Sequence, residues 1–211
     1  EPIRAYAGLN SADGIKAMAK LAAEELRRTG GLERDVIAVA TTTGTGWINE
    51  AEASSLEYMY NGDTAIVSMQ YSFLPSWISF LVDQENARQA GQALFEAVDA
   101  LVRELPENDR PKLVVFGESL GSFGGEAPFL ALNNLIARTD GALFSGPTFK
   151  NTIWTNLTIN RDEGSPQWLP IFDKGENVRF SAIAAKDLGR PADPWGQPRV
   201  VYLQHASDPI A

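Results

Sequence analysis

The amino-acid sequence predicts an α/β fold, with a mostly parallel central sheet and helices on both of its faces. Short β-branched runs alternate with longer amphipathic runs along the 211 residues, which is typical of strand–helix–strand units. The run at 112–116 (KLVVF) is uniformly apolar, as expected of a strand that helices cover on both faces. A glycine-rich turn at 117–121 follows it and leads into the next helical segment. These observations place a buried parallel strand and a tight turn near the middle of the chain.

Each predicted element has a local signal. Residues 11–30 predict a helix, because Ser11 to Asp13 form a capping signal and the glycines at 30–31 end the amphipathic pattern. The other expected elements are helices at 51–60, about 78–104 and 123–138, and strands at 35–42, 64–71, 112–116, 141–145 and 199–204.

The composition indicates a single soluble domain over residues 1–211. An apolar share of 44% and a charged share of 21% are ordinary for a globular protein. Residues 147–197 have weak periodicity but contain Trp154, Trp168 and Trp195, so we expect a cap-like insertion over the carboxyl edge of the sheet. The chain stops directly after an apolar run, which predicts a core that is truncated at its C-terminus.

Charge and residue types exclude several function classes. The 27 acidic and 18 basic residues give a formal net charge of -9, which disfavours a nucleic-acid partner. The absence of cysteine excludes disulfides, thiolate metal sites and a cysteine nucleophile. No histidine or carboxylate motif has metal-ligand spacing, and the glycine-rich turn lacks the Lys-Ser/Thr of a P-loop. We therefore expect no metal, no nucleotide and no other cofactor.

The sharpest signal is the G-x-S-x-G sequence at 117–121 (GESLG), between a predicted strand and a predicted helix. In this context Ser119 is the candidate nucleophile, on a strained turn that points its hydroxyl out of the sheet. Gly117 and Gly121 are the flanks that must be small, and the Leu120 N–H is a candidate oxyanion donor at the helix start. There are two alternative interpretations: glycine-rich turns also bind phosphates, and so short a pattern also occurs by chance in unrelated proteins. The strand before the turn and the helix after it favour the nucleophile.

A second oxyanion donor is expected in the loop after the strand at 35–42. The small residues Thr43, Gly44, Thr45 and Gly46 occupy this loop, and the glycines let the backbone approach a substrate closely. The pattern does not select one amide among the four. The alternative interpretation is an ordinary flexible turn.

The predicted strand at 199–204 leads into a loop that contains Asp208, where a carboxylate could orient a histidine. A surface-turn carboxylate is the alternative. The single histidine, His205, precedes Asp208, whereas the histidine of such a triad follows the acid. We therefore interpret His205 as a structural residue and expect the general base beyond Ala211. Without a base, the Ser119 hydroxyl is a weak nucleophile at neutral pH.

With these residues in view, the chain resembles the α/β-hydrolase superfamily, and more specifically the catalytic domain of bacterial membrane-linked α/β-hydrolases. The resemblance covers nearly the whole chain and rests on the strings at 43–47, 70–77, 116–125, 164–166 and 204–210. It implies an α/β-hydrolase fold, a nucleophile at Ser119, an acid at Asp208 and a histidine from a C-terminal portion outside the chain. It also implies membrane attachment through missing N-terminal segments. It implies no substrate, because fold does not fix function.

Together these features predict a serine hydrolase of the esterase or lipase type that acts on an ester or thioester, with a small-molecule or lipid-like acyl substrate. An acyltransferase would use the same site with an alcohol as acceptor. A non-catalytic binding or scaffold module is the alternative from another class, since the chain lacks an evident base.

Overall fold

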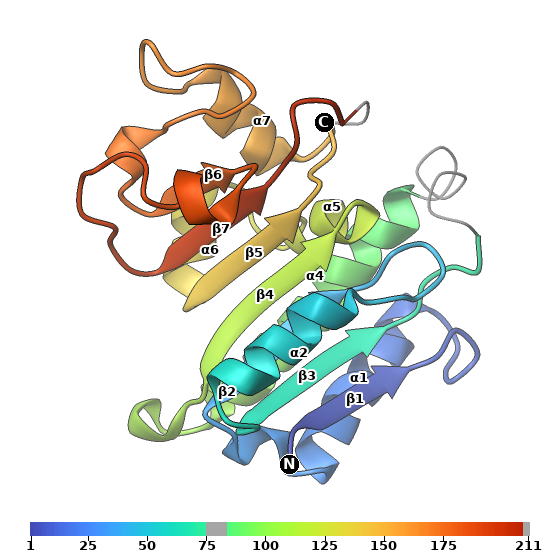
Figure 1. Cartoon of the computed structure of the whole chain (residues 1–211). Coiled ribbons are helices and arrows are strands. Elements are labelled where there is room, and N and C mark those ends of the chain that lie inside the picture. Colours follow the sequence, from blue (N-terminus) through green and yellow to red (C-terminus); the bar gives the residue numbers. More distant parts are fainter. Residues whose placement is uncertain (75–83, 209–211) are drawn as a thin grey trace.

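The structure, a computed structural model, describes residues 1–74 and 84–208 (Figure 1). Within these ranges, seven strands form one parallel sheet in the order β1-β3-β2-β4-β5-β7-β6. The strands are β1 (Ile3–Ala7), β2 (Val36–Thr41), β3 (Thr64–Met69), β4 (Lys112–Glu118), β5 (Gly141–Ser145), β6 (Val178–Ser181) and β7 (Arg199–Leu203). The predicted α/β class with a parallel sheet is confirmed, and in the described residues every strand pairing is parallel. The loops that follow the strands consequently share one edge of the sheet.

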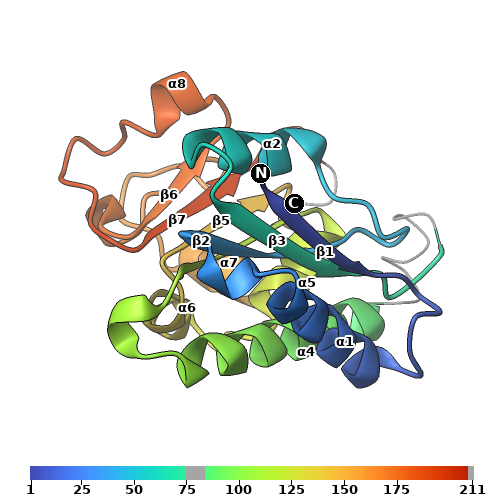
Figure 2. The same cartoon turned by 90° about the horizontal axis from the view of Figure 1, so that it is seen from below.

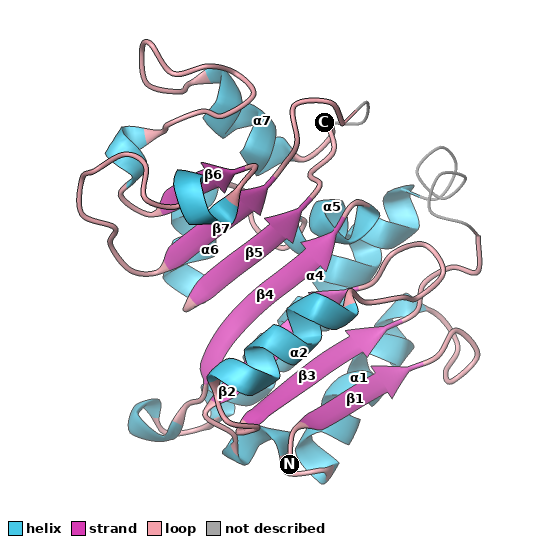
Figure 3. Ribbon diagram, viewed as in Figure 1, coloured by secondary structure: helices cyan, strands magenta, loops and turns pink. Residues whose placement is uncertain are grey.

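Helices cover both faces of this sheet (Figures 2 and 3). Helices α1, α4 and α5 pack together on one face, and α2 lies on the opposite face. The helices are α1 (Ile15–Arg28), α2 (Glu50–Met59), α4 (Gln84–Glu104), α5 (Leu120–Glu126), α6 (Leu132–Arg138), α7 (Thr152–Ile159) and α8 (Ala184–Asp187). The interior strands β2 and β3 are buried along their whole length, as expected of strands that are covered on both faces and consist mainly of apolar residues.

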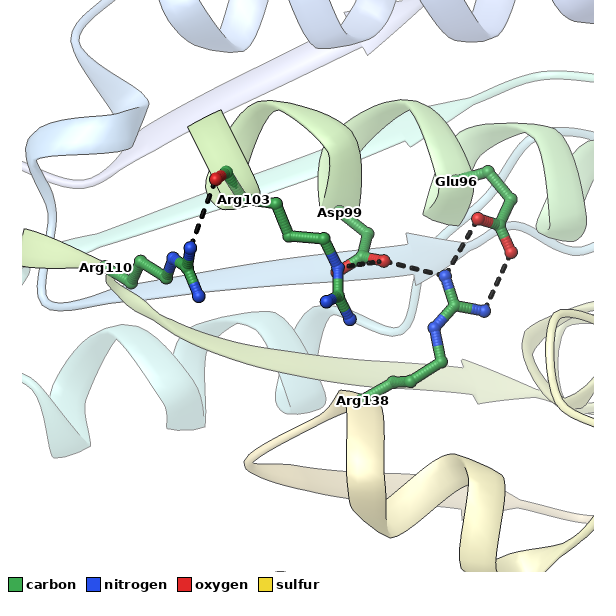
Figure 4. A network of polar contacts seen from close by, with 5 residues as sticks. All are labelled: Glu96, Asp99, Arg103, Arg110 and Arg138. Carbon is green, nitrogen blue, oxygen red and sulfur yellow. Dashed lines mark hydrogen bonds and ion pairs between the residues drawn. The ribbon is translucent and has the colours of Figure 1, made fainter. Parts of the chain in front are cut away.

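A network of ion pairs joins α4 to α6 (Figure 4). Arg138 of α6 donates to Glu96 at 2.8 Å and to Asp99 at 2.7 Å, both on α4. Arg103 also contacts the Asp99 carboxylate, whose side chain is only 8% exposed. The Arg138 guanidinium also lies 4.7 Å from the centre of the Phe95 ring. The charge of Arg138 is therefore paired and packed at once, which fixes α6 against α4.

Several predicted boundaries differ from the structure. The capping signal at Ser11 is wrong, because α1 begins after Gly14, whose φ of 87° only glycine adopts without strain. The predicted helix 123–138 is two helices, α5 and α6, since Pro128 has no amide to continue the helical ladder. Strand β1 was not predicted, because alternate residues of this short edge strand are not buried. The first part of the predicted helix 78–104, residues 78–83, lies outside the described residues.

The segment predicted as a cap-like insertion, 147–197, contains α7, a short 3-10 turn, β6 and α8. Strand β6 pairs with β7, so residues 178–181 extend the main sheet at its edge. The remainder of the segment lies at the end of the sheet near β7 (Figure 1). The assignment of one core with a cap-like insertion stays a prediction.

Candidate active site

Ser119 is the single residue between the end of β4 and the start of α5. Its φ of 54° and ψ of -118° lie in a region that non-glycine residues rarely adopt. A backbone conformation of this kind costs about 1–3 kcal/mol, and residues that adopt one cluster at functional sites. Ser119 is only partly buried, so its side chain is not sealed in the core. The turn is therefore sharp and strained, as the motif predicts.

Hydrogen bonds hold the Ser119 backbone on both sides. Its N–H donates to the carbonyl oxygen of Ser145, at the end of β5, at 2.8 Å. Its own carbonyl oxygen accepts from the Ser122 N–H at 2.9 Å and from the Ser122 Oγ at 2.7 Å. Because both peptide groups are fixed, the strained conformation is imposed by the surrounding structure rather than relaxed by it.

The two flanking glycines allow this turn to form. A Cβ atom at Gly117 would lie 2.4 Å from the carbonyl oxygen of Gly121. A Cβ atom at Gly121 would lie 2.4 Å from the carbonyl oxygen of Thr41, at the end of β2. Both distances are far below van der Waals contact, and both obstructing atoms are backbone. The predicted requirement for small flanks therefore has a direct geometric cause, and the turn lies tightly against β2.

The candidate oxyanion donors lie on the two segments that meet here. Leu120 is the first residue of α5, and within the described chain its N–H has no backbone acceptor. In the loop after β2, the Thr43 N–H donates to the Trp47 oxygen at 3.0 Å and the Gly46 N–H to the Thr43 oxygen at 2.9 Å. Among the residues described, the amides of Gly44 and Thr45 make no backbone hydrogen bond. These two are the amides of the loop that the structure leaves available to a ligand.

Asp208 lies in the loop after β7, and because β4, β5 and β7 pair in parallel, this loop begins at the same edge of the sheet as the turn that contains Ser119. A Cβ atom at Gly146 would be 3.8 Å from the Asp208 Oδ2. Gly146 directly follows Ser145, whose carbonyl oxygen holds the Ser119 amide. Residues at the end of β5 thus adjoin both sites: Ser145 bonds the Ser119 amide, and Gly146 lines a pocket together with Asp208.

His205 lines the same pocket as Gly146 and Asp208. It is exposed, and its Nδ1 lies 2.8 Å from the Ser207 Oγ of its own loop. Its carbonyl oxygen accepts from the Asp208 N–H at 2.9 Å. These contacts are those of a residue that shapes the loop around Asp208.

A comparison with protein families establishes which family the chain belongs to. The family model described as "Alpha/beta-hydrolase family" matches residues 3–211. The chain belongs to the alpha/beta-hydrolase family. Membership of this family indicates a hydrolytic enzyme, and the family match spans the turn at 117–121 and the Asp208 loop alike.

Solved structures similar to this alpha/beta-hydrolase include two of acetyl xylan esterase. An iodinated complex of acetyl xylan esterase has a TM-score of 0.48 and 14% sequence identity, and the match covers 84% of this chain and 85% of that chain. A second acetylxylan esterase structure has a TM-score of 0.46 and 14% identity, covering 85% of this chain and 84% of that chain. No curated protein matches the chain significantly.

Two further features of this alpha/beta-hydrolase concern metal binding and membrane crossing. Across the described residues, no group of three or more His, Cys, Asp or Glu side chains is arranged to hold a metal ion. No helix in the described ranges combines the length and apolarity that a membrane crossing requires. The membrane attachment that the resemblance implies stays a prediction.

Two carboxylates near the site were not expected from the sequence. Glu52, in the first turn of α2, accepts a 2.5 Å hydrogen bond from the Ser145 Oγ. Burial raises the pKa of Glu52, and the charge of nearby Glu118 raises it further. Asn49 donates to Glu118 at 3.2 Å. No sequence pattern indicates this cluster, because its members lie 69 and 93 residues apart along the chain.

The second unexpected carboxylate is Glu126, at the end of α5, which is fully buried. It accepts from the Tyr202 hydroxyl at 2.7 Å and from the backbone N–H groups of Ile153 and Trp154 at 2.9 and 3.3 Å. Burial raises the pKa of Glu126 to about 6, although these donors and the Asn151 side chain act to lower it. Glu126 thus connects the helix that starts after Ser119 to α7 and to β7, the strand that leads to Asp208.

Proposed function

We propose that this protein is a serine hydrolase of the esterase or lipase type that cleaves an ester or thioester through Ser119. The observation that supports this most is the strained backbone of Ser119 at a strand-to-helix turn, fixed by hydrogen bonds on both sides. A backbone held in this way fixes the position of the Ser119 Cβ, which lowers the reorganisation that attack on a carbonyl carbon requires.

In the proposed reaction, the Ser119 Oγ bonds to the carbonyl carbon and its proton passes to a general base. The negative charge that develops on the carbonyl oxygen is stabilised by the Leu120 N–H and by an N–H of Gly44 or Thr45. Collapse of this intermediate expels the alcohol or thiol, which takes up the proton, and leaves an acyl group on Ser119. Water then attacks the acyl group by the same steps, which releases a carboxylic acid and returns the proton to the Ser119 oxygen.

The proposed acid is Asp208, which would orient the base and stabilise its positive charge. We place the base on a histidine outside residues 1–211, because His205 is exposed and bonded within its own loop. An acyl group with apolar character is the proposed substrate. Exposed aromatic residues support it: Trp47, 54% exposed, follows β2, and Phe73, 73% exposed, follows β3 at the same edge of the sheet.

The test is ester hydrolysis by the full-length protein, measured with p-nitrophenyl esters of two to twelve carbons. We expect turnover that Ser119→Ala abolishes and Asp208→Ala lowers strongly, with folding of both variants checked by circular dichroism. If the full-length protein leaves these esters and their thioester analogues intact and a fluorophosphonate does not label it, the enzyme assignment is wrong, and a binding or scaffold module with this fold is the remaining alternative.

A further inference from the structure

The first turn of α2 directly follows the loop that contains the candidate oxyanion amides. Asn49 is the N-cap of this helix, and its Oδ1 accepts from the N–H groups of Ala51 and Glu52 at 2.9 and 3.3 Å. Only two residues, Trp47 and Ile48, separate Asn49 from the end of the loop segment 43–46. The position of the capped turn therefore controls where the loop ends.

Two side chains of this turn reach across to the strand ends around Ser119. The Asn49 Nδ2 donates to the Oε2 of Glu118, the residue before Ser119, at 3.2 Å. The Ser145 Oγ donates to the Oε1 of Glu52 at 2.5 Å. Ser145 is also the residue whose carbonyl oxygen accepts the Ser119 N–H, at 2.8 Å. The turn of α2 is thus bonded to a covalent neighbour of the candidate nucleophile and to its hydrogen-bond partner.

The chemistry of an oxyanion hole explains why such bonds would matter. The two amides that bind the oxyanion come from separate segments, α5 and the loop after β2, and each must lie about 2.7–3.1 Å from one oxygen. A site of this kind functions only if its supporting contacts hold the two segments to within about 0.5 Å of each other. Backbone pairing fixes β2 against β4 as far as Thr41 and Gly117, and the loop beyond Thr41 has left the sheet.

We propose that Asn49 and Glu52 are positioning residues that hold the oxyanion loop at a fixed distance from Ser119. This inference rests on the proposed function. Through Asn49 and Glu118, and through Glu52 and Ser145, the loop and the nucleophile turn move as one unit. We name these two contacts the α2 clamp. Neither residue touches the reacting atoms, so their effect appears in the geometry of the two amides.

The structure offers variants that break the α2 clamp while leaving the helix capped. Asn49→Asp keeps the Oδ1 that caps α2, loses the donor to Glu118 and puts two negative charges side by side. Glu52→Ala removes the acceptor of Ser145, whereas Glu52→Gln keeps an acceptor oxygen and should restore function. The matched control is Glu57→Gln on the same helix, which replaces the charged partner of Arg4 of β1, 2.7 Å away, by a neutral one.

The experiment measures kcat and KM of the full-length protein for the best p-nitrophenyl ester. We expect Asn49→Asp and Glu52→Ala to lower kcat by about 10-fold to 100-fold with KM nearly unchanged, because the oxyanion forms only on the way to the transition state. Glu52→Gln should recover most of kcat, and Glu57→Gln should match the wild type. Equal losses in Glu57→Gln and Glu52→Ala would show that general helix stability is responsible, which overturns the proposal.

Amide hydrogen exchange, read by mass spectrometry, tests the clamp without any activity. Peptides that cover residues 42–48 should exchange faster in Asn49→Asp and Glu52→Ala than in the wild type and in Glu57→Gln. Unchanged exchange in this loop overturns the clamp whatever the kinetics show. If the full-length wild type hydrolyses no ester, the proposed function fails separately, and the exchange result still decides whether Asn49 and Glu52 hold the loop.

Discussion

Replacing Glu126 by glutamine should change how the stability of the protein depends on pH. The carboxyl group is fully buried, and its pKa in the folded protein is about 6, compared with 4.5 for an unperturbed group. Between these two pH values the folded state binds more protons at this site than the unfolded state does. Its contribution to stability therefore increases as the pH falls from about 7 to about 4.5, the reverse of the usual behaviour of a salt-bridged carboxylate.

The size of the effect follows from the pKa. A rise from 4.5 to about 6 corresponds to about 2 kcal/mol of free energy of unfolding across that pH range. Glutamine has no proton to bind, so Glu126→Gln removes this dependence. The amide NH₂ of glutamine also faces some of the N–H and O–H groups that donate to the carboxylate. Two donors then face each other, which destabilises the variant at all pH values by about 1–3 kcal/mol.

The assay is urea unfolding of wild type and Glu126→Gln at several pH values between 4.5 and 7. The difference in free energy of unfolding should be about 2 kcal/mol larger at pH 4.5 than at pH 7, and other titrating groups cancel in this difference. Tyr202→Phe is the companion variant: because the Tyr202 hydroxyl lowers the pKa of Glu126, its loss should move the dependence to higher pH. A difference between wild type and Glu126→Gln that stays constant over this range would refute the reasoning.

Three further outcomes are expected. Gly121→Ala should cost about 1–3 kcal/mol in urea unfolding and should strongly slow reaction with a fluorophosphonate, because its Cβ meets the Thr41 carbonyl oxygen; a normal rate would contradict the close approach. Arg138→Ala should destabilise the fold by about 3 kcal/mol, since it leaves the buried Asp99 with Arg103 alone and exposes the Phe95 ring; a loss below about 0.5 kcal/mol would contradict this. Thr45→Pro should lower kcat by about 10-fold to 1000-fold if the Thr45 amide binds the oxyanion, and Gly44→Pro should do so if the Gly44 amide binds it. Full activity in both variants would show that neither amide of this loop binds the oxyanion.

The turn at 117–121 could be predicted because all of its determinants are local. A strand, a G-x-S-x-G sequence and a helix follow one another within a few residues, and the glycines are required by contacts with neighbouring backbone. The interior strands could be predicted for a similar reason, since helices cover them and most of their residues are apolar. Edge strand β1 could not, because only one of its faces is buried and its five residues give too short an alternation.

The carboxylates around the site could not be predicted, because their partners are distant in sequence. Glu52 meets a residue 93 positions away, and Glu126 meets Tyr202 76 positions away. On the sequence both look like ordinary acidic residues of an amphipathic helix. Only the packing of α2 and α5 on opposite faces of the sheet brings them to the strand ends, so their environment depends on the completed fold.

Mapping the adduct of a fluorophosphonate on the full-length protein tests the central claim most directly. After digestion, mass spectrometry should locate the phosphonyl group on Ser119 alone, with no label in Ser119→Ala and full labelling in the control Ser55→Ala on the surface of α2. Labelling of another serine, or equal labelling of Ser119→Ala, would contradict the assignment of Ser119 as the nucleophile.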